Sequence, residues 1–218
     1  MPHARRRFGF DEQEGAWTKL NASRVGDGES SPPWVSWSSS VPPLPHAMFI
    51  AADARTHRDE LIELNVEYMS WVFAEIEKLF GLAADDIVGM PARDYVPTFI
   101  DKVCGDPPPK GIFYIVKSGG RLAGMGGLRS LGHGLAEVKR IYCRPVHRGM
   151  GLGESLLQRL LADAKAFGYE RVCLDTAPFM TSAHRVYERN GFVDRSPYDG
   201  TEVPLEFHAR WRFMERAL

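Results

Sequence analysis

A glycine-rich turn carries the clearest chemical signal in the sequence. Residues 147–154 read His-Arg-Gly-Met-Gly-Leu-Gly-Glu and join an apolar run to an amphipathic helical run. The first turn of a helix has unpaired backbone N–H groups, and its dipole favours an anion. Glycine lets a phosphate approach those groups, and a neighbouring guanidinium matches phosphate geometry. We therefore expect a phosphate-binding turn made of Arg148, Gly149, Met150, Gly151, Leu152 and Gly153.

The turn differs from two common phosphate-binding loops. A Walker loop ends in Gly-Lys-Ser/Thr, whereas residues 153–155 read Gly-Glu-Ser and lack the lysine. A dinucleotide-binding fingerprint reads G-x-G-x-x-G, whereas this turn reads G-x-G-x-G and lies late in the chain. Asp175 follows Gly153 by 22 residues and matches the acidic residue of that fingerprint. A nucleotide-binding enzyme of Rossmann type therefore stays an alternative.

Strands and helices are expected on both sides of this turn. Helices are expected over residues 58–80, 95–103, 151–167 and 181–189. Strands are expected over residues 48–51, 111–117, 121–128, 135–144, 171–176 and 205–213, the last on its clean apolar–polar alternation. Strand, helix and strand over residues 135–176 predict a right-handed crossover between parallel strands. The predicted fold is α/β (α+β), with a mixed, mostly antiparallel central sheet, one parallel βαβ crossover and helices on both faces.

Composition divides the chain into two parts. Residues 1–46 hold six of the 15 prolines and a serine-rich run, so we expect a disordered or loosely docked segment. Residues 47–218 are expected to form a single folded domain, and Met48 is an alternative start of the protein. The basic residues 5–7 are followed at once by acidic residues, which argues against a targeting peptide.

Charge and cysteine content exclude several classes of protein. The net charge is −1 and no apolar run approaches the ~18 residues of a membrane span, so we expect neither a nucleic-acid nor a membrane partner. Three cysteines form no close pair, and the seven histidines show no metal-ligand spacing. We therefore expect a cytoplasmic protein without a metal site.

Two spaced motifs together resemble the GNAT superfamily of acyl-CoA-dependent N-acyltransferases. Its phosphate motif, Q/R-x-x-G-x-G/A, fits residues 148–153, and its tyrosine four residues before a Gly-Phe pair fits Tyr187. The strand before the turn also stands where the family has it, and the resemblance covers roughly residues 48–216. One departure is Met180, which replaces an asparagine that many members use to contact the cofactor.

The resemblance implies an N-acetyltransferase that uses acetyl-CoA and a primary amine on a small molecule or peptide. It implies that the cofactor's pantetheine arm pairs with Ile141, Tyr142 and Cys143, while its pyrophosphate rests on the N–H groups of residues 148–153. Glu137 would be the general base and Tyr187 the acid that protonates the leaving thiolate. Family members build the acceptor pocket from their first helices, which here offer Tyr68, Trp71 and Asp94.

Several alternatives stay open at this point. Glu137 could be a strand residue paired with Lys139 or Arg140, and Tyr187 could be a core residue of an amphipathic helix. A cysteine nucleophile is disfavoured because no activating base stands out and buried cysteines are usually inert. The whole chain could also be a non-catalytic CoA-binding regulatory module. Neither the acceptor, the acyl chain length nor the oligomeric state is encoded in these motifs.

Overall fold

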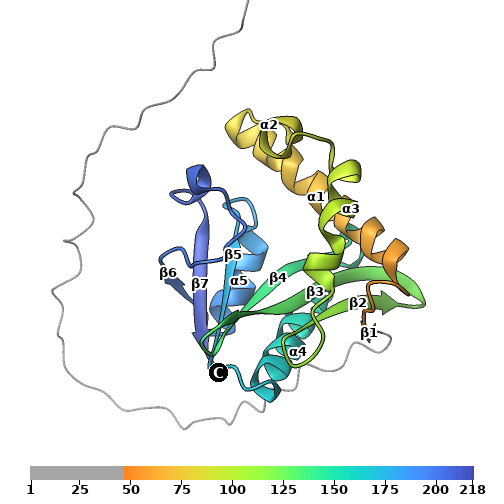
Figure 1. The fold of residues 1–218 in the computed structure, drawn as a ribbon, viewed down its shortest axis with the longest axis vertical. Helices are drawn as coiled ribbons and strands as arrows, with labels where there is room; N and C mark the ends of the chain where they lie inside the picture. The colour runs from red at the N-terminus through yellow and green to blue at the C-terminus, as the bar shows by residue number, and fades with distance from the viewer. Residues whose placement is uncertain (1–46) are drawn as a thin grey trace, which may run out of the picture. The chain divides into compact units, whose positions relative to one another are not determined.

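A seven-stranded sheet in the order β1-β2-β3-β4-β5-β7-β6 runs through residues 47–218, the part of the chain that this computed structural model describes (Figure 1). Neighbouring strands are antiparallel except β4 and β5, which run parallel. The strands are β1 (Ala47–Ala51), β2 (Gly111–Ser118), β3 (Arg121–Gly132), β4 (Leu135–Cys143), β5 (Arg171–Thr176), β6 (Val193–Arg195) and β7 (Arg212–Ala217). The predicted mixed sheet with one parallel crossover is confirmed. The expectation for residues 1–46 lies outside the described residues.

Five α-helices and two 3₁₀ turns accompany the sheet. They are α1 (Arg58–Phe80), α2 (Ala84–Val88), α3 (Ala92–Cys104), η1 (Pro145–His147), α4 (Leu152–Ala166), α5 (Thr181–Arg189) and η2 (Leu205–Phe207). The long helix α1 ends because Gly81 adopts a left-handed conformation (φ 70°) and its N–H bonds back to Glu77. The predicted bounds of α1, β5 and α5 match the structure, whereas the short elements α2 and β6 were not predicted.

Helices cover both faces of the sheet, as the sequence predicts (Figure 1). Successive residues of β2 alternate between the two faces: Phe113 and Ile115 pack with α1 and α3, while Tyr114 and Val116 pack in the cluster that includes α4. The α4 cluster also takes in Tyr187 from α5. Two apolar layers therefore hold α1 and α4 on opposite sides of the strands.

The predicted strand over residues 205–213 is wrong except at its last two residues. Leu205–Phe207 forms the turn η2, and the strand runs instead over Arg212–Ala217. The buried ring of Phe207 packs against Trp211 with their centroids 5.5 Å apart. The alternation of residues two apart predicts a strand, but Phe207 and Trp211 are four residues apart and share a face in a helical turn as well. Backbone N–H groups of Arg210 and Trp211 bonding to the Phe207 carbonyl fix the turn.

Strands β4 and β5 separate after a short paired stretch. Their pairing covers only residues 135–137 of β4, ending at Glu137 opposite Cys173. Opposite β3, the register of β4 shifts between Met125 and Gly127, and Arg140 has a left-handed backbone (φ 55°). A bulge of this kind bends a strand and increases its twist, which turns β4 away from its parallel neighbour. The sheet is thereby opened beside the carboxyl end of β5.

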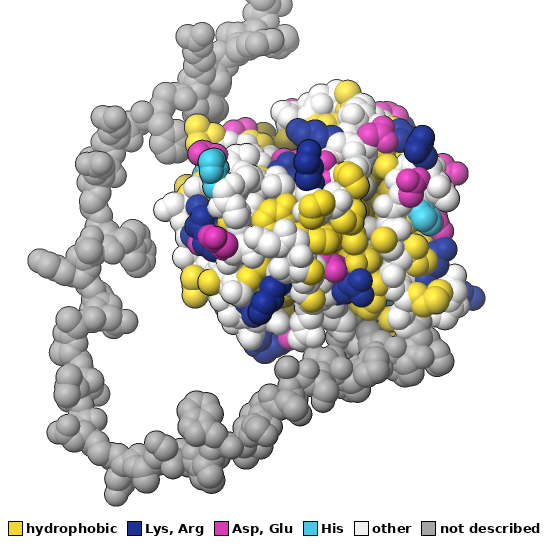
Figure 2. Space-filling model, turned by 60° about the horizontal axis from the view of Figure 1, so that its bottom comes forward, with side chains coloured by type: hydrophobic (Ala, Val, Ile, Leu, Met, Phe, Trp, Pro, Cys, Tyr) yellow, Lys and Arg dark blue, Asp and Glu magenta, His cyan; other side chains and the backbone are white. Residues whose placement is uncertain are grey.

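The surface of the described domain is mixed in charge. Figure 2 shows acidic and basic side chains interspersed around a central group of hydrophobic side chains on one face. Within residues 47–218, no helix combines the length and the apolar character that crossing a bilayer requires.

Candidate active site

The turn between β4 and α4 leaves a row of backbone donors free. Gly151 caps α4 with φ 78°, without a side-chain hydrogen bond, and the first helical bond runs from Ser155 N–H to the Gly151 carbonyl. Within the described residues, the N–H groups of residues 149–154 have no acceptor. A Cβ added at Gly149 or Gly151 would meet nothing within 4 Å, so both glycines are needed for their positive φ. Residues 149–154 therefore fit an anion.

Arg148 lies beside this turn and also touches α1. Its Nε donates to the Cys143 carbonyl at 3.0 Å, and its guanidinium lies 5.5 Å from the centroid of the Trp71 ring. Its own backbone N–H bonds to Pro145, so the backbone amide predicted for the pyrophosphate is already in use at this residue. The side chain is exposed at the end of β4. The guanidinium is thus held at the mouth of the turn, and a phosphate contact by its Nη groups stays a prediction.

Ile141, Tyr142 and Cys143 form the second half of β4, beyond the point where β5 leaves it. Tyr142 and Cys143 pair with Met125 and Gly124 of β3, so one edge of this stretch is satisfied and the edge toward β5 has no strand partner. Burial raises the pKa of the Cys143 thiol to about 11, so this cysteine is a neutral thiol near pH 7. The free edge suits an extended ligand that pairs with backbone groups.

Tyr187 is buried on α5, and its ring packs against Phe192. Burial raises the pKa of its phenol, and Tyr68, Asp175 and Cys143 add to the shift. The phenol is therefore neutral and can donate a proton. Tyr187 packs in the apolar cluster that includes Leu174 of β5 and Cys143 of β4. No hydrogen bond of its hydroxyl is formed within residues 47–218.

A pocket of about 370 Å³ lies where α1, α2 and η2 meet the middle of β4 and the carboxyl end of β5. Figure 1 shows α1 and α2 facing β5 and the η2 loop across this part of the molecule. Tyr68 and Met180 line the pocket, whereas Trp71 and Asp94 do not: Trp71 stacks on Phe179 and Arg148, and Asp94 is exposed. Most of the remaining wall is apolar, from Val72, Phe73, Ile76, Ile87, Phe207 and Trp211.

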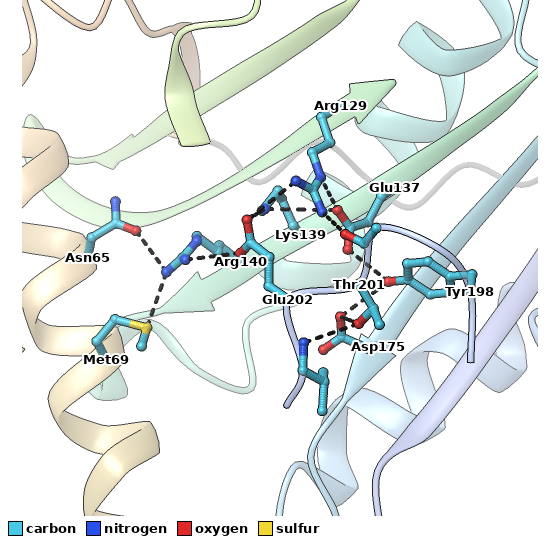
Figure 3. A network of polar contacts seen from close by, with 12 residues as sticks. Asn65, Met69, Arg129, Glu137, Lys139, Arg140, Asp175, Tyr198, Thr201 and Glu202 are labelled. Carbon is cyan, nitrogen blue, oxygen red and sulfur yellow. Dashed lines mark hydrogen bonds and ion pairs between the residues drawn. The ribbon is translucent and has the colours of Figure 1, made fainter. Parts of the chain in front are cut away.

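Glu137 stands on the polar wall of this pocket, and its side chain is only 2% exposed (Figure 3). Its Oε1 accepts a hydrogen bond from the Tyr198 hydroxyl at 2.8 Å, and its Oε2 pairs with Arg129 and lies 3.9 Å from Lys139. Both oxygens are therefore engaged, one of them with the Lys139 partner that the sequence suggested. The predicted role as general base remains a prediction.

Asp175 is a second carboxylate of the pocket, and sequence analysis did not consider it as a base. Its Oδ2 accepts from the Tyr198 hydroxyl at 3.2 Å and from Thr201 at 3.4 Å (Figure 3). Burial, followed by the charge of Glu137, raises its pKa to about 6. The sequence feature that could have identified Asp175 as a site residue is its position as an acidic residue inside the otherwise largely apolar strand β5. A carboxylate with a pKa near neutrality is suited to proton transfer.

The described residues contain no cluster of histidine, cysteine and acidic side chains that could hold a metal ion. All three cysteines are free thiols. The site thus offers a row of backbone amides, an open strand edge, a phenol and the three pocket carboxylates of Glu137, Asp175 and Glu202, arranged around the β4–β5 opening.

Comparison with known proteins agrees with this arrangement. The sequence model described as the acetyltransferase (GNAT) family matches residues 59–192. An uncharacterised N-acetyltransferase of Schizosaccharomyces pombe is 30% identical over 128 residues, which cover 58% of this chain and 72% of that protein. A GNAT-family acetyltransferase structure from Staphylococcus aureus has a TM-score of 0.58 at 20% identity, covering 79% of this chain and 99% of that chain.

A PaiA N-acetyltransferase from Thermoplasma acidophilum, solved in complex with coenzyme A, covers 79% of this chain and 99% of its own at a TM-score of 0.56 and 17% identity. The resemblance drawn from two motifs is confirmed, and with it the prediction of an N-acyltransferase enzyme. The family match spans more than half of the sequence, and this chain therefore belongs to the GNAT family of acetyltransferases.

Proposed function

We propose that this protein transfers an acetyl group from acetyl-CoA to the primary amine of a small molecule, by direct attack in a ternary complex. The observation that carries the proposal is the row of unbonded N–H groups over residues 149–154, at one end of the opening whose other end is the acceptor pocket. The pocket's volume of about 370 Å³ favours a small molecule over a peptide.

Coenzyme A would be held mainly by backbone groups. The N–H groups of residues 149–153 would bind its pyrophosphate, and the free edge of residues 141–143 would pair with its pantetheine arm. When bound, the thioester supplies an activated acyl group, and the products are an amide and a free thiol. Because these contacts come from the backbone, the replacement of the family's asparagine by Met180 leaves them intact.

Asp175 is proposed to accept the proton that the ammonium group must lose before it can attack. Its pKa of about 6 leaves it ionised at neutral pH, and it is not ion-paired with an arginine. Glu137 would act through Asp175, since its charge raises the pKa of Asp175 and both carboxylates share the Tyr198 hydroxyl. This assigns Asp175 the role predicted for Glu137 and leaves Glu137 as a positioning residue.

Tyr187 is proposed to protonate the departing sulfur. The new C–N bond forms as the C–S bond breaks, and the nitrogen gives up two protons overall. Asp175 passes one of them to solvent; the Tyr187 hydroxyl gives its proton to the sulfur and recovers the second. The raised pKa of Tyr187 keeps it protonated until that step.

Release of free thiol from acetyl-CoA across a panel of amines tests the proposal, with acetyl-CoA binding measured separately by calorimetry. We expect amine-dependent thiol release by the wild type. Tight acetyl-CoA binding with no release for any amine would favour the regulatory CoA-binding module instead. A thermal shift with NAD and none with acetyl-CoA would overturn the proposal, because a ligand that binds the folded state raises its melting temperature.

A further inference from the structure

Two buried donor atoms on the polar wall of the pocket have no hydrogen-bond partner within the described residues. They are Lys139 Nζ and Arg140 Nε, on side chains that are 7% and 10% exposed. Both residues line the pocket. Buried polar atoms are nearly always hydrogen-bonded, and a buried donor left without an acceptor destabilises the folded protein. These two atoms therefore mark a place where an acceptor belongs.

The carboxylates nearby do not satisfy the cations around them (Figure 3). The Glu202 carboxylate is shared by three cations. Lys139 Nζ lies 2.9 Å from one of its oxygens without hydrogen-bond geometry, and guanidinium nitrogens of Arg129 and Arg140 lie 3.3 and 3.4 Å from its oxygens. The Glu137 carboxylate accepts hydrogen bonds from Arg129 and Tyr198. Three cations thus share two carboxylates, which leaves one positive charge over.

The third carboxylate of the pocket, Asp175, does not pair with any of these cations. Its hydrogen bonds come from the hydroxyls of Tyr198 and Thr201. Lys139 and Asp175 each lie two residues past the last paired position of β4 and β5, Glu137 opposite Cys173. Lys139 has an ion pair with Glu202 but no hydrogen bond at its Nζ, and Asp175 has no ion pair within the described residues. The two residues thus stand at matching positions of β4 and β5, just beyond the point where the strands separate.

The rest of the pocket is shaped for an apolar group. Phe73, Phe207 and Trp211 line it together with aliphatic side chains of α1 and α2. Its volume of about 370 Å³ suits one compact apolar side chain beside a small polar head.

We propose that the acceptor is a hydrophobic amino acid, or an amine of the same pattern, whose carboxylate binds Lys139 and Arg140 while its amine faces Asp175. This inference rests on the proposed function and deepens it by naming the substrate class. An α-amino acid carries a carboxylate and an amine on one carbon, as the paired charges across the opening require. A polyamine would place a further positive charge beside Lys139 and Arg140, so the pocket discriminates against it.

Matched pairs of substrates test the proposal on the full-length wild-type protein. Each pair is an amino acid and its own carboxamide, and the amino acids are L-phenylalanine, L-leucine, L-methionine and L-tryptophan. Phenethylamine and spermidine are added as amines that carry no carboxylate. The amine and the side chain are the same within a pair, and only the charged carboxylate is lost. A charge-assisted hydrogen bond is worth about twice a neutral one, so we expect kcat/KM to be at least about tenfold higher for the acid in the preferred pair.

Two variants sharpen the test. Lys139→Met should raise the KM of the amino acid about tenfold and leave the KM of its carboxamide unchanged. Glu202→Gln should lower the KM of the amino acid, because it removes the carboxylate that competes for the same cations. Lys117→Met is the matched control. It removes a partly buried lysine of β2 that pairs with Glu60 of α1, outside the pocket, and should change neither KM.

Equal kcat/KM for acids and carboxamides, or a carboxamide KM that rises in Lys139→Met as much as the acid KM, would overturn the proposal. If no amine is acetylated, the proposed function fails, and binding then decides the inference separately. In that case, L-phenylalanine or another acid of the panel should raise the melting temperature of the wild type but not that of Lys139→Met. The matching carboxamide should leave the melting temperature of both proteins unchanged. An absence of any acid-dependent shift would also reject it.

Discussion

The phosphate-binding turn and the acceptor pocket are built in different ways. The turn comes from eight consecutive residues and is proposed to bind phosphate through backbone N–H groups, which would leave most of its side chains free to vary. The pocket gathers side chains from α1, α2, α3, β4, β5 and the segment around η2. A local backbone site can be shared by a whole family, whereas a site assembled from distant side chains can be changed one residue at a time. On the proposed function, cofactor recognition and acceptor choice are therefore separate in this fold.

Asp175→Asn is the substitution with the largest expected effect, and it tests whether the pocket can be changed without affecting cofactor binding. We expect kcat/KM for the acceptor to fall by about 10²–10⁴-fold, because the group that takes the ammonium proton is lost. Acetyl-CoA affinity should stay within about twofold, since that ligand depends on the backbone turn. Steady-state kinetics and calorimetry measure the two quantities. The exposed Asp194→Asn, which loses a surface pair with Arg212, is the control and should leave both unchanged.

The pH profile adds a signature that a structural role of Asp175 would not produce. A base must be ionised, so kcat/KM should rise with pH through about 6 and level off above it, up to the pKa of the amine. Asp175→Asn should abolish this break. A break near pH 6 that survives the substitution would contradict the assignment of Asp175.

Tyr187→Phe should have the next largest effect. Removing the phenol takes away the proton donor for the thiolate, so kcat should fall by about 10²-fold. The ring still packs against Phe192, and acetyl-CoA binding should persist. Single-turnover thiol release compared with calorimetric affinity checks both statements. A variant that keeps full kcat would show that Tyr187 is a core residue only.

Glu137→Gln should act mainly on stability. Glu137 and Arg129 are buried as a pair, and removing one partner of a buried pair typically costs about 3 kcal/mol. The pH break of Asp175 should also move to lower pH, because the Glu137 charge that raises the pKa of Asp175 is lost. Chemical denaturation and the pH profile measure these effects. A loss of kcat equal to that of Asp175→Asn, at unchanged stability, would return the role of base to Glu137.

The same division explains what the sequence could predict. The turn, the tyrosine of α5 and most element bounds follow from local patterns, and the structure confirms the fold that they imply. The η2 segment was predicted as a strand because its residues alternate with a period of two, whereas the backbone hydrogen bonds to the Phe207 carbonyl that fix the turn leave no such pattern in the sequence. Asp175 and Glu202 were missed as members of one site because their neighbours lie far away in the chain: Glu202 meets Lys139 only after the segment before β7 folds back over β4. Periodicity in one window carries no information on such contacts.

The smallest expected effect tests the turn itself, through Gly151→Ala. A non-glycine residue in a left-handed conformation costs about 1–2 kcal/mol, and here a Cβ meets no other atom, so strain is the only change. We expect the melting temperature to fall by about 3 °C and acetyl-CoA affinity to fall by up to about tenfold, as the turn relaxes and its N–H groups shift.

Gly168→Ala is the matched control for that variant, since Gly168 also has a positive φ (86°) in open space, just beyond the other end of α4. It should lose the same stability and bind acetyl-CoA normally. Equal affinity losses in the two variants would mean that general destabilisation, rather than the geometry of residues 149–154, controls cofactor binding. A selective loss in Gly151→Ala, with the acid preference of the pocket unchanged, would establish that the two halves of the site act independently.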